Sequence, residues 1–243
     1  MEKGQTAEPG ASAAESRGVE GMLLVDKPAG ITSHDVVLIA RRAYGERSIG
    51  HLGTLDPFAT GLLILLLGKA TRLANHMDVE PKVYDATIHF GAETDTDDST
   101  GSVTREADVP VADAVSAAVG KLTGTFAQIP PDYSAKSVDG TRAYKTARKG
   151  APVELRPARV TVHSWEIRER TNDSLRAKIT CSGGTYIRAL ARDLGRATNS
   201  AAHLSALRRL SIGEFDVRDA MSLDQVKAAQ SPPRKLRIVV ADD

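Results

Sequence analysis

A run of six apolar residues at 62–67 follows a loop in which Gly50, Gly53 and Gly61 are separated by polar side chains. The run is too short to span a membrane, so it predicts a strand buried within the fold. The residue before a proline is kept out of the helical region of backbone space. Asp56, which precedes Pro57, is therefore expected in an extended or turn conformation on a stiff loop that leads into the core.

Other periodic patterns predict a mixture of helices and strands. Residues 34–44 have apolar positions at helical spacing after the N-cap candidates Thr32 and Ser33, and Gly45 ends the pattern. Residues 82–91 alternate as a strand does, and 159–168 and 175–181 predict a hairpin. Further helices are expected at 68–77, 110–122, 141–149 and 222–229. This mixture favours the α+β class.

The chain of 243 residues is long enough for one large domain. We expect a disordered N-terminal tail at 1–18, a single folded domain at 19–230 and a C-terminal tail at 231–243. The single cysteine, Cys181, excludes an intrachain disulfide and a cysteine-based zinc site. With no apolar segment long enough for a membrane span or a signal peptide, a cytoplasmic location is expected.

Charge is distributed unevenly, although the formal net charge is only +1. Residues 136–159 carry seven basic side chains against two acidic ones, and residues 78–113 carry ten acidic side chains against two basic ones. The basic stretch is suited to RNA phosphates, or it is an ordinary solvated helix face. The acidic stretch contains part of the spacing of a calcium loop, but its glycine is one position late and a strand precedes it, so no metal site is expected.

Asp56 and His51 are the candidate functional side chains of the glycine-rich loop. A rigid loop on a folded scaffold is a common place for catalytic groups. Asp-Pro is also an ordinary turn dipeptide, and a lone histidine is more often a plain loop residue. Local chemistry alone leaves both interpretations open.

The segment GHLGTLDPFATGLLILLLGKATRL at 50–73 resembles the catalytic motif of the TruB-type tRNA pseudouridine synthases. Three other segments resemble motifs of the same family: Asp-Lys-Pro-Ala-Gly-Ile-Thr-Ser at 26–33, Gly-Thr-Tyr-Ile-Arg at 184–188 and Leu-Arg-Arg at 207–209. A fifth, Pro-Pro-Asp-Tyr-Ser-Ala at 130–135, departs from the family pattern, because Ser137 stands where a lysine is usual. The resemblance covers about residues 21–223.

The resemblance implies an isomerase that converts the uridine at position 55 in the tRNA T-arm to pseudouridine. It implies a mixed, largely antiparallel sheet flanked by helices and loops, with no cofactor and no metal. We also expect a monomer that binds the T-arm stem-loop of tRNA and not a membrane. Many members of the family continue into a small RNA-binding PUA domain, and we expect none in this chain.

Site roles also follow from the resemblance. Asp56 would be the catalytic carboxylate, paired with Arg188, and Tyr84 would stack on the target base. His51 would stabilise the opened RNA loop, while Tyr186 and Leu207 would line the base pocket. From the residues alone, Tyr84 could equally be a half-buried strand tyrosine, Leu207 a core leucine and Arg188 a surface residue.

Two other functions remain as alternatives. A catalytically silent RNA-binding or tRNA-folding protein would not need Asp56, which is present. A metal-dependent hydrolase would want clustered histidine and aspartate ligands, whereas the six histidines are scattered along the chain.

Overall fold

The computed structural model of the chain describes residues 19–77, 79–132, 137–138, 141–142 and 156–235. The predicted N-terminal tail and most of the basic stretch lie outside these residues. Within them, a ten-stranded sheet has the order β14-β1-β3-β12-β4-β11-β10-β7, with β2 added beside β3 and β13 beside β12. Only β1–β14 and β3–β12 pair in parallel, so the expected mixed, largely antiparallel sheet is confirmed.

The strands of the sheet have the following bounds: β1 Gly21–Lys27, β2 Ile49–Leu52, β3 Thr60–Leu67, β4 Lys82–Phe90, β7 Gly124–Gln128, β10 Ala158–Arg170, β11 Ser174–Cys181, β12 Ala202–Ile212, β13 Phe215–Asp216 and β14 Met221–Ser222. Two short hairpins stand apart, β5 Ala92–Thr94 with β6 Val103–Glu106, and β8 Ser137–Val138 with β9 Thr141–Arg142. The helices are α1 Ser33–Tyr44, α2 Ala112–Lys121, α4 Ile187–Ala197 and α5 Leu223–Lys227, with the 3₁₀ helices η1 Gly68–Leu73 and η2 Val217–Asp219.

The apolar run at 62–67 forms β3, and both faces of this strand are buried. Leu63, Leu65 and Leu67 pack with α1 and α5, whereas Leu62, Ile64 and Leu66 join a second apolar cluster on the opposite face. A strand covered on both faces needs apolar residues at every position, which explains why the run does not alternate.

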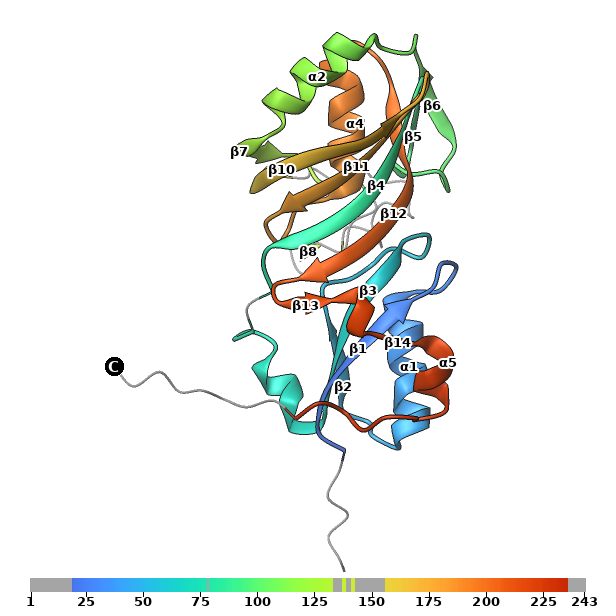
Figure 1. The fold of residues 1–243 in the computed structure, drawn as a ribbon, viewed down its shortest axis with the longest axis vertical. Coiled ribbons are helices and arrows are strands. Elements are labelled where there is room, and N and C mark those ends of the chain that lie inside the picture. The colour runs from blue at the N-terminus through green and yellow to red at the C-terminus, as the bar shows by residue number, and fades with distance from the viewer. Residues whose placement is uncertain (1–18, 78, 133–136, 139–140, 143–155, 236–243) are drawn as a thin grey trace, which may run out of the picture.

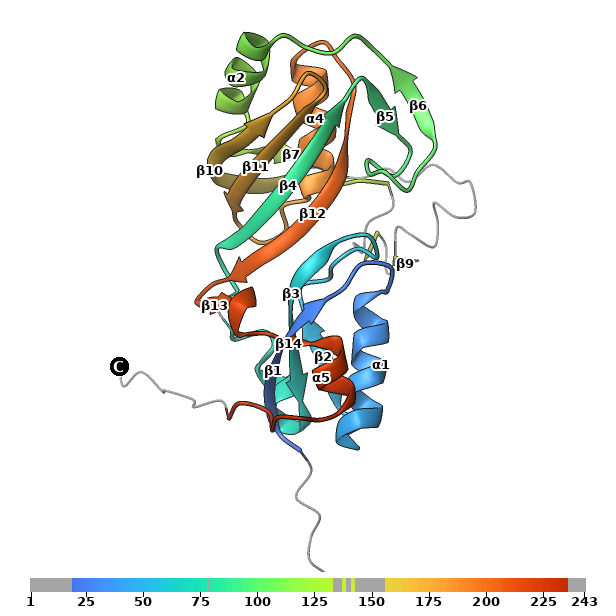
Figure 2. The same cartoon turned by 45° about the vertical axis from the view of Figure 1, so that its right-hand side comes forward.

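The sheet has two halves that meet where β3 lies beside β12 (Figures 1 and 2). α1 and α5 cover the half that contains β1 and β3. α2 and α4 cover the half formed by β4, β11 and β10, where the third and largest apolar cluster lies. Leu55 and Ala59, from the loop before β3, are buried in this third cluster, so the loop crosses from one half to the other.

Most predicted elements are present, and two expectations need correction. Residues 68–77 form the 3₁₀ helix η1 and turns, not an α-helix, since the bonds of this segment close three residues back, as from Ala74 to Thr71. Thr141–Arg142 is strand β9, where a helix was expected to begin, and the rest of that segment lies outside the described residues. Arg234, in the predicted C-terminal tail, exchanges two backbone hydrogen bonds with Met22.

Candidate active site

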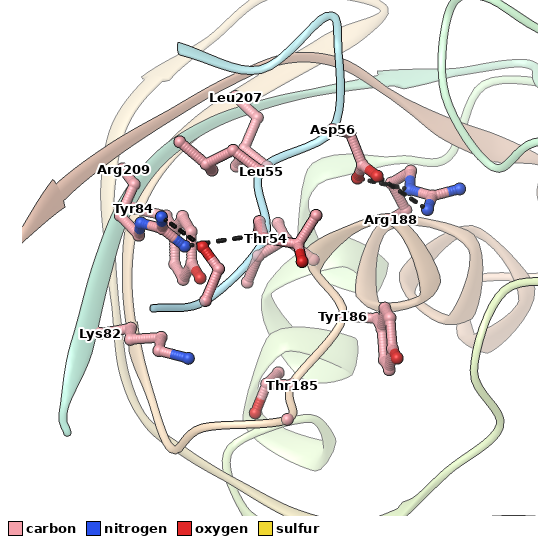
Figure 3. Close-up of a pocket in the computed structure, with 13 residues that line it drawn as sticks. Thr54, Leu55, Asp56, Lys82, Tyr84, Thr185, Tyr186, Arg188, Leu207 and Arg209 are labelled. Carbon is pink, nitrogen blue, oxygen red and sulfur yellow. Dashed lines mark hydrogen bonds and ion pairs between the residues drawn. The ribbon is translucent and has the colours of Figure 1, made fainter. Parts of the chain in front are cut away.

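A pocket of about 210 Å³ opens at the junction of the two halves of the sheet (Figure 3). Drug-sized ligands occupy pockets of about 300–1,000 Å³, so this one suits a smaller group such as a single pyrimidine base. The lining residues come from four segments: Gly53, Thr54, Leu55 and Asp56 before β3; Lys82 and Tyr84 on β4; Gly184, Thr185, Tyr186, Ile187 and Arg188 at the start of α4; Leu207 and Arg209 on β12.

The loop that carries Asp56 is fixed by the segment between β1 and α1. The Ser33 hydroxyl accepts a hydrogen bond from the Leu55 amide at 2.9 Å and donates to the Leu55 carbonyl at 3.0 Å. The buried Lys27 ammonium donates to the carbonyls of Pro28, Ile31 and Pro57. Burial lowers the pKa of Lys27 to about 8. Asp56 is thus flanked by two backbone segments that are both held in place.

Asp56 forms a bidentate ion pair with Arg188, as the resemblance implied. Arg188 Nε donates to Asp56 Oδ2 at 2.9 Å and Arg188 Nη2 donates to Oδ1 at 3.2 Å. The arginine side chain is 6% exposed and the carboxylate 35% exposed. The carboxylate therefore faces the pocket while its counterion is buried behind it.

Arg188 is held in turn by the acidic loop after β5. Its Nη1 donates to the Thr96 carbonyl at 2.7 Å, and its Nε lies 3.7 Å from the buried Asp98 carboxylate. Asp98 also accepts hydrogen bonds from the Thr96 hydroxyl and from the amide and hydroxyl of Thr100. An arginine in the first turn of a helix opposes the helix dipole, and these anions and carbonyls compensate for that position.

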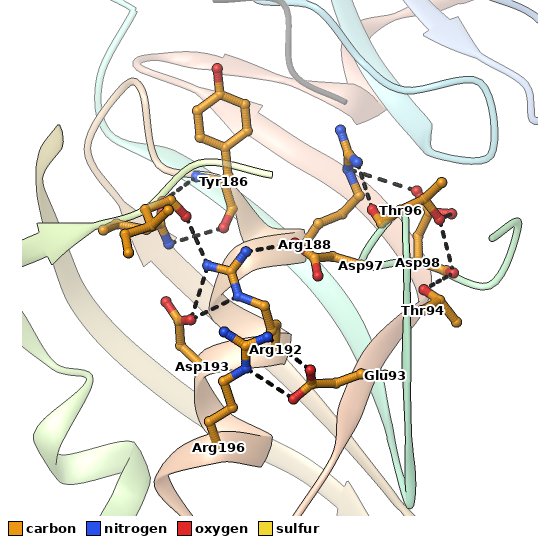
Figure 4. A network of polar contacts seen from close by, with 12 residues as sticks. Glu93, Thr94, Thr96, Asp97, Asp98, Tyr186, Arg188, Arg192, Asp193 and Arg196 are labelled. Atoms are coloured by element: carbon orange, nitrogen blue, oxygen red, sulfur yellow. Dashed lines mark hydrogen bonds and ion pairs between the residues drawn. The ribbon is translucent and has the colours of Figure 1, made fainter. Parts of the chain in front are cut away.

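Further arginine–carboxylate pairs join α4 to β5 and to the acidic loop that follows it (Figure 4). Arg192 Nη1 donates to Asp97 at 2.8 Å, and Arg196 binds Glu93 with two hydrogen bonds. Burial raises the pKa of Asp97 to about 6, against the attraction of Arg192. The acidic stretch seen in the sequence is therefore not a solvated surface at these positions: three of its carboxylates are buried against α4.

Arg209 is the largest buried side chain in the pocket wall, and it ties β12 to the loop. Its Nε donates to the Leu62 carbonyl at 2.7 Å and its Nη2 to the Gly53 carbonyl at 2.8 Å. It pairs across the sheet with Tyr84, whose ring is buried beside it. Burial raises the pKa of Tyr84, and the nearby guanidinium opposes that effect only in part. Tyr84 is therefore a neutral phenol at physiological pH.

Five of the six residues singled out from the sequence line this pocket: Asp56, Tyr84, Tyr186, Arg188 and Leu207. His51 lies on β2, two residues before the first lining residue, and is not part of the wall. The N-cap position of α4 is Tyr186, and no side chain caps the helix there. The Tyr186 backbone is held by Gln128, through one hydrogen bond to its amide and one to its carbonyl.

Sequence reasoning missed Lys82 and Arg209 in the wall. Strand alternation was a usable signal, because residues two apart share a face. Lys82 stands two residues before Tyr84 on β4, and Arg209 two residues after Leu207 on β12. Lys82 therefore shares a strand face with Tyr84, and Arg209 shares one with Leu207, two residues that the sequence had already indicated.

Two further features concern metals and membranes. Within the described residues, no group of three or more histidine, cysteine, aspartate or glutamate side chains is arranged to hold a metal ion. No helix in that part of the chain is long and apolar enough to cross a membrane.

Two family models match the chain. The N-terminal domain of the TruB family pseudouridylate synthases matches residues 41–187, and the tRNA pseudouridylate synthase B C-terminal domain matches residues 188–241. The boundary between the two matches falls within α4, so the pocket draws Asp56 and Tyr84 from one region and Arg188 and Leu207 from the other.

Curated relatives and solved structures agree with these matches. The chain is 48% identical to a tRNA pseudouridine synthase B of Thermobifida fusca, over 86% of this chain and 75% of the relative. It is 43% identical to a tRNA pseudouridine synthase B of Opitutus terrae, over 91% of this chain and 92% of the relative. Among solved structures, one chain of a Cbf5-Nop10-Gar1 complex has a TM-score of 0.67 and 28% identity, with 89% of this chain and 56% of that chain covered.

Proposed function

The chain belongs to the TruB family of pseudouridylate synthases, and we propose that it isomerises the uridine at position 55 in the T-arm of tRNA to pseudouridine. The observation that carries this proposal is the Asp56–Arg188 pair, a carboxylate open to a base-sized pocket and backed by a buried guanidinium. The match to curated tRNA pseudouridine synthases supports the substrate class.

The proposed reaction exchanges one bond of the nucleoside for another. The N1–C1′ bond breaks, the base turns, and a C5–C1′ bond forms. The proton leaves C5, and N1 ends with a proton of its own, so that atoms and charge balance without an oxidant, a reductant or an energy source. In this proposal no metal takes part, and the protein supplies position, charge and proton transfer.

Asp56 is the proposed catalytic carboxylate. Its two oxygens are oriented by Arg188, and the neighbouring backbone is fixed through Ser33 and Lys27. Such preorganisation keeps the carboxylate from having to move during the reaction. Attack on the nucleoside and removal of a ribose proton are both within the reach of an ionised carboxylate.

The target base has to leave the RNA stack to enter this pocket, which costs a few kcal/mol. Tyr84 would stack on the extruded base, an interaction worth about 1–3 kcal/mol. Leu207 and Tyr186 would form the remaining walls, and both line the pocket. His51 would act outside the pocket, on the RNA loop that the base has left.

The test is tritium release from a tRNA transcript labelled at C5 of uridine, measured in EDTA. Since the C5 proton is lost in the reaction, the wild-type protein should release one tritium per target uridine. A transcript with cytidine at position 55 should release none above background. Release from that transcript would contradict the assigned position, and loss of activity in EDTA would contradict the metal-free reaction.

A catalytically silent RNA-binding protein is the competing function. It predicts that tRNA binds and that no tritium is released from any transcript. That result would overturn the proposed reaction while leaving the family assignment intact.

A further inference from the structure

Three cations line the pocket: Lys82, Arg188 and Arg209. Arg188 pairs with Asp56, and Arg209 binds backbone carbonyls. The contacts described above assign no role to Lys82. It is the first residue of β4, on the same face as Tyr84, and its side chain is partly buried in the wall. Figure 3 shows Lys82 at the end of the pocket away from Asp56 and Arg188, with Tyr84 and Arg209 nearby. The pocket therefore has a carboxylate at one end and an ammonium at the other.

Arg209 and Lys82 differ in how many of their hydrogen-bond donors are already used within the protein. Arg209 is occupied by the carbonyls of Leu62 and Gly53. Within the described part of the chain, Lys82 Nζ donates no hydrogen bond to another residue. The two acids nearest to Lys82 are Glu80 and Cys181. Glu80 accepts a hydrogen bond from the Gly183 amide, and burial raises the pKa of the Cys181 thiol to about 11, so the thiol is neutral. An ammonium has three donors and no acceptor, so it is suited to a carbonyl-bearing ligand.

We infer that Lys82 reads the carbonyl edge of the target uracil, donating a hydrogen bond to O4 of the bound base. The inference rests on the proposed function. When the glycosidic N1 lies beside Asp56, C4 is the ring atom directly opposite N1, so O4 points to the far end of the pocket. That end is where Lys82 lies.

The turn of the base preserves this contact. Reaching C5 requires the ring to rotate about the axis through N3 and C6, which exchanges N1 with C5 and C2 with C4. O2 then takes the place that O4 had, and N3 stays where it was. A single donor at this end of the pocket thus binds the base before and after rotation.

The same contact provides specificity. Cytosine carries an amino group in place of O4, so its donor would face the Lys82 donor. A site built to hydrogen-bond one polar group discriminates strongly against a ligand that cannot make that bond. Lys82 therefore selects uracil over cytosine at the target position.

The experiment compares four single-turnover rates: wild type and Lys82→Met, each with a tRNA transcript carrying uridine or 4-thiouridine at the target position. Sulfur is the weaker hydrogen-bond acceptor, and any change in the intrinsic reactivity of the base is common to both enzymes and cancels in the comparison. Lys82→Met should slow uridine conversion by about 10- to 100-fold, the size expected for a lost charged hydrogen bond. The slowdown caused by 4-thiouridine should be several-fold smaller in Lys82→Met than in wild type.

Controls separate a role in base recognition from a structural role. The melting temperature and the Kd for tRNA should stay unchanged in Lys82→Met, because phosphate contacts dominate tRNA affinity. Lys82→Arg keeps a donor and should keep its sensitivity to 4-thiouridine. Lys178→Met, on the neighbouring β11 and outside the pocket, removes a partly exposed lysine and should leave all rates unchanged. Should Lys82→Met fail to fold, the four rates are measured with Lys82→Leu, which also lacks a hydrogen-bond donor.

Two results would overturn the inference, and they are distinguishable. An active wild-type enzyme whose sensitivity to 4-thiouridine is unchanged in Lys82→Met would contradict the role of Lys82 alone. A wild-type enzyme that binds tRNA and converts no uridine would contradict the proposed function as well.

Discussion

The guanidinium of Arg188 contacts both carboxylate oxygens of Asp56, although the two residues are 132 positions apart in the sequence. Only 6% of the arginine side chain is exposed, against 35% of the aspartate side chain. This asymmetry leaves the carboxylate open to a ligand and keeps its positive partner out of water. The ion pair holds the carboxylate in one orientation and still leaves it accessible to a ligand, which are two requirements of a preorganised site.

Asp56→Asn should reduce pseudouridine formation by at least about 10²–10⁴-fold, the usual contribution of a catalytic acid or base. The amide is nearly the same size as the carboxylate, so tRNA affinity should be retained. It carries no negative charge and cannot replace the carboxylate in the reaction. The measurement is tritium release together with a filter-binding Kd.

Asp26→Asn is the matched control for that variant. Asp26 also forms a bidentate pair with an arginine, Arg208, and is similarly exposed at 33%, but it does not line the pocket. It should keep wild-type turnover. Equal activity of the two variants would show that the Asp56 carboxylate has no special role.

Arg209 and Arg208 are adjacent on β12 and should differ strongly in their contribution to folding. Arg209→Met takes this donor from the buried Leu62 carbonyl and from the carbonyl of the exposed Gly53, and we expect a loss of about 2–5 kcal/mol in the free energy of unfolding. Arg208→Met removes a half-exposed ion pair and should cost no more than about 1 kcal/mol. Urea unfolding measures both. Similar losses for the two variants would contradict the structural role given to Arg209.

Asp97 should make the fold less stable as pH rises through the acid range. In the folded protein its pKa is raised from 3.8 to about 6 by burial, so between these values the folded chain holds a proton that the unfolded chain has released. Its stabilising effect is therefore complete below about pH 4 and is lost by about pH 6, amounting to roughly 3 kcal/mol.

The comparison with Asp97→Asn isolates this effect from the other carboxylates. The free energy of unfolding of each protein is measured by urea titration from pH 4.5 to pH 7.5. The difference, wild type minus variant, should fall as pH rises. A difference that stays constant with pH would show that Asp97 does not titrate in this range.

Gly61→Ala should weaken the junction between the two halves of the sheet. Gly61 has a φ of +102°, and a Cβ there would lie 2.2 Å from the Arg209 carbonyl oxygen on the paired strand β12. Positive φ and this clash together should cost more than about 2 kcal/mol. Gly120→Ala in α2 meets nothing within 4 Å and should stabilise the protein by about 0.5–1 kcal/mol. Thermal unfolding of both variants tests the sign of each effect.

Much of the local structure could be predicted from the sequence because its causes are local. The cap at Thr32, the stop at Gly45 and the helix between them depend on neighbouring residues, and the structure contains all three. The doubly buried strand at 62–67 and the hairpin of β10 and β11 follow from hydrophobic periodicity. At 68–77, where an α-helix was expected, the structure has a 3₁₀ helix and turns.

The site was predictable only in part. Resemblance to a family indicated Asp56, Tyr84, Arg188, Tyr186 and Leu207, and these five meet in one pocket. Lys82 and Arg209 were missed although strand alternation marked their positions. The burial of Glu93, Asp97 and Asp98 against α4 had no signal in the sequence, where the same residues read as a hydrophilic acidic stretch.

The sequence by itself thus determined the elements, the apolar faces and the motif residues, since each depends on neighbours a few positions away. The tertiary structure decided which charges meet. Pairing Asp56 with Arg188, or Asp97 with Arg192, depends on how β3, β4, β12 and α4 are brought together, and no spacing along the chain encodes it. Electrostatic interactions act through space between groups far apart in the chain. For that reason the Asp56–Arg188 pair could be expected only from the family resemblance, and the Asp97–Arg192 pair became visible only in the folded protein.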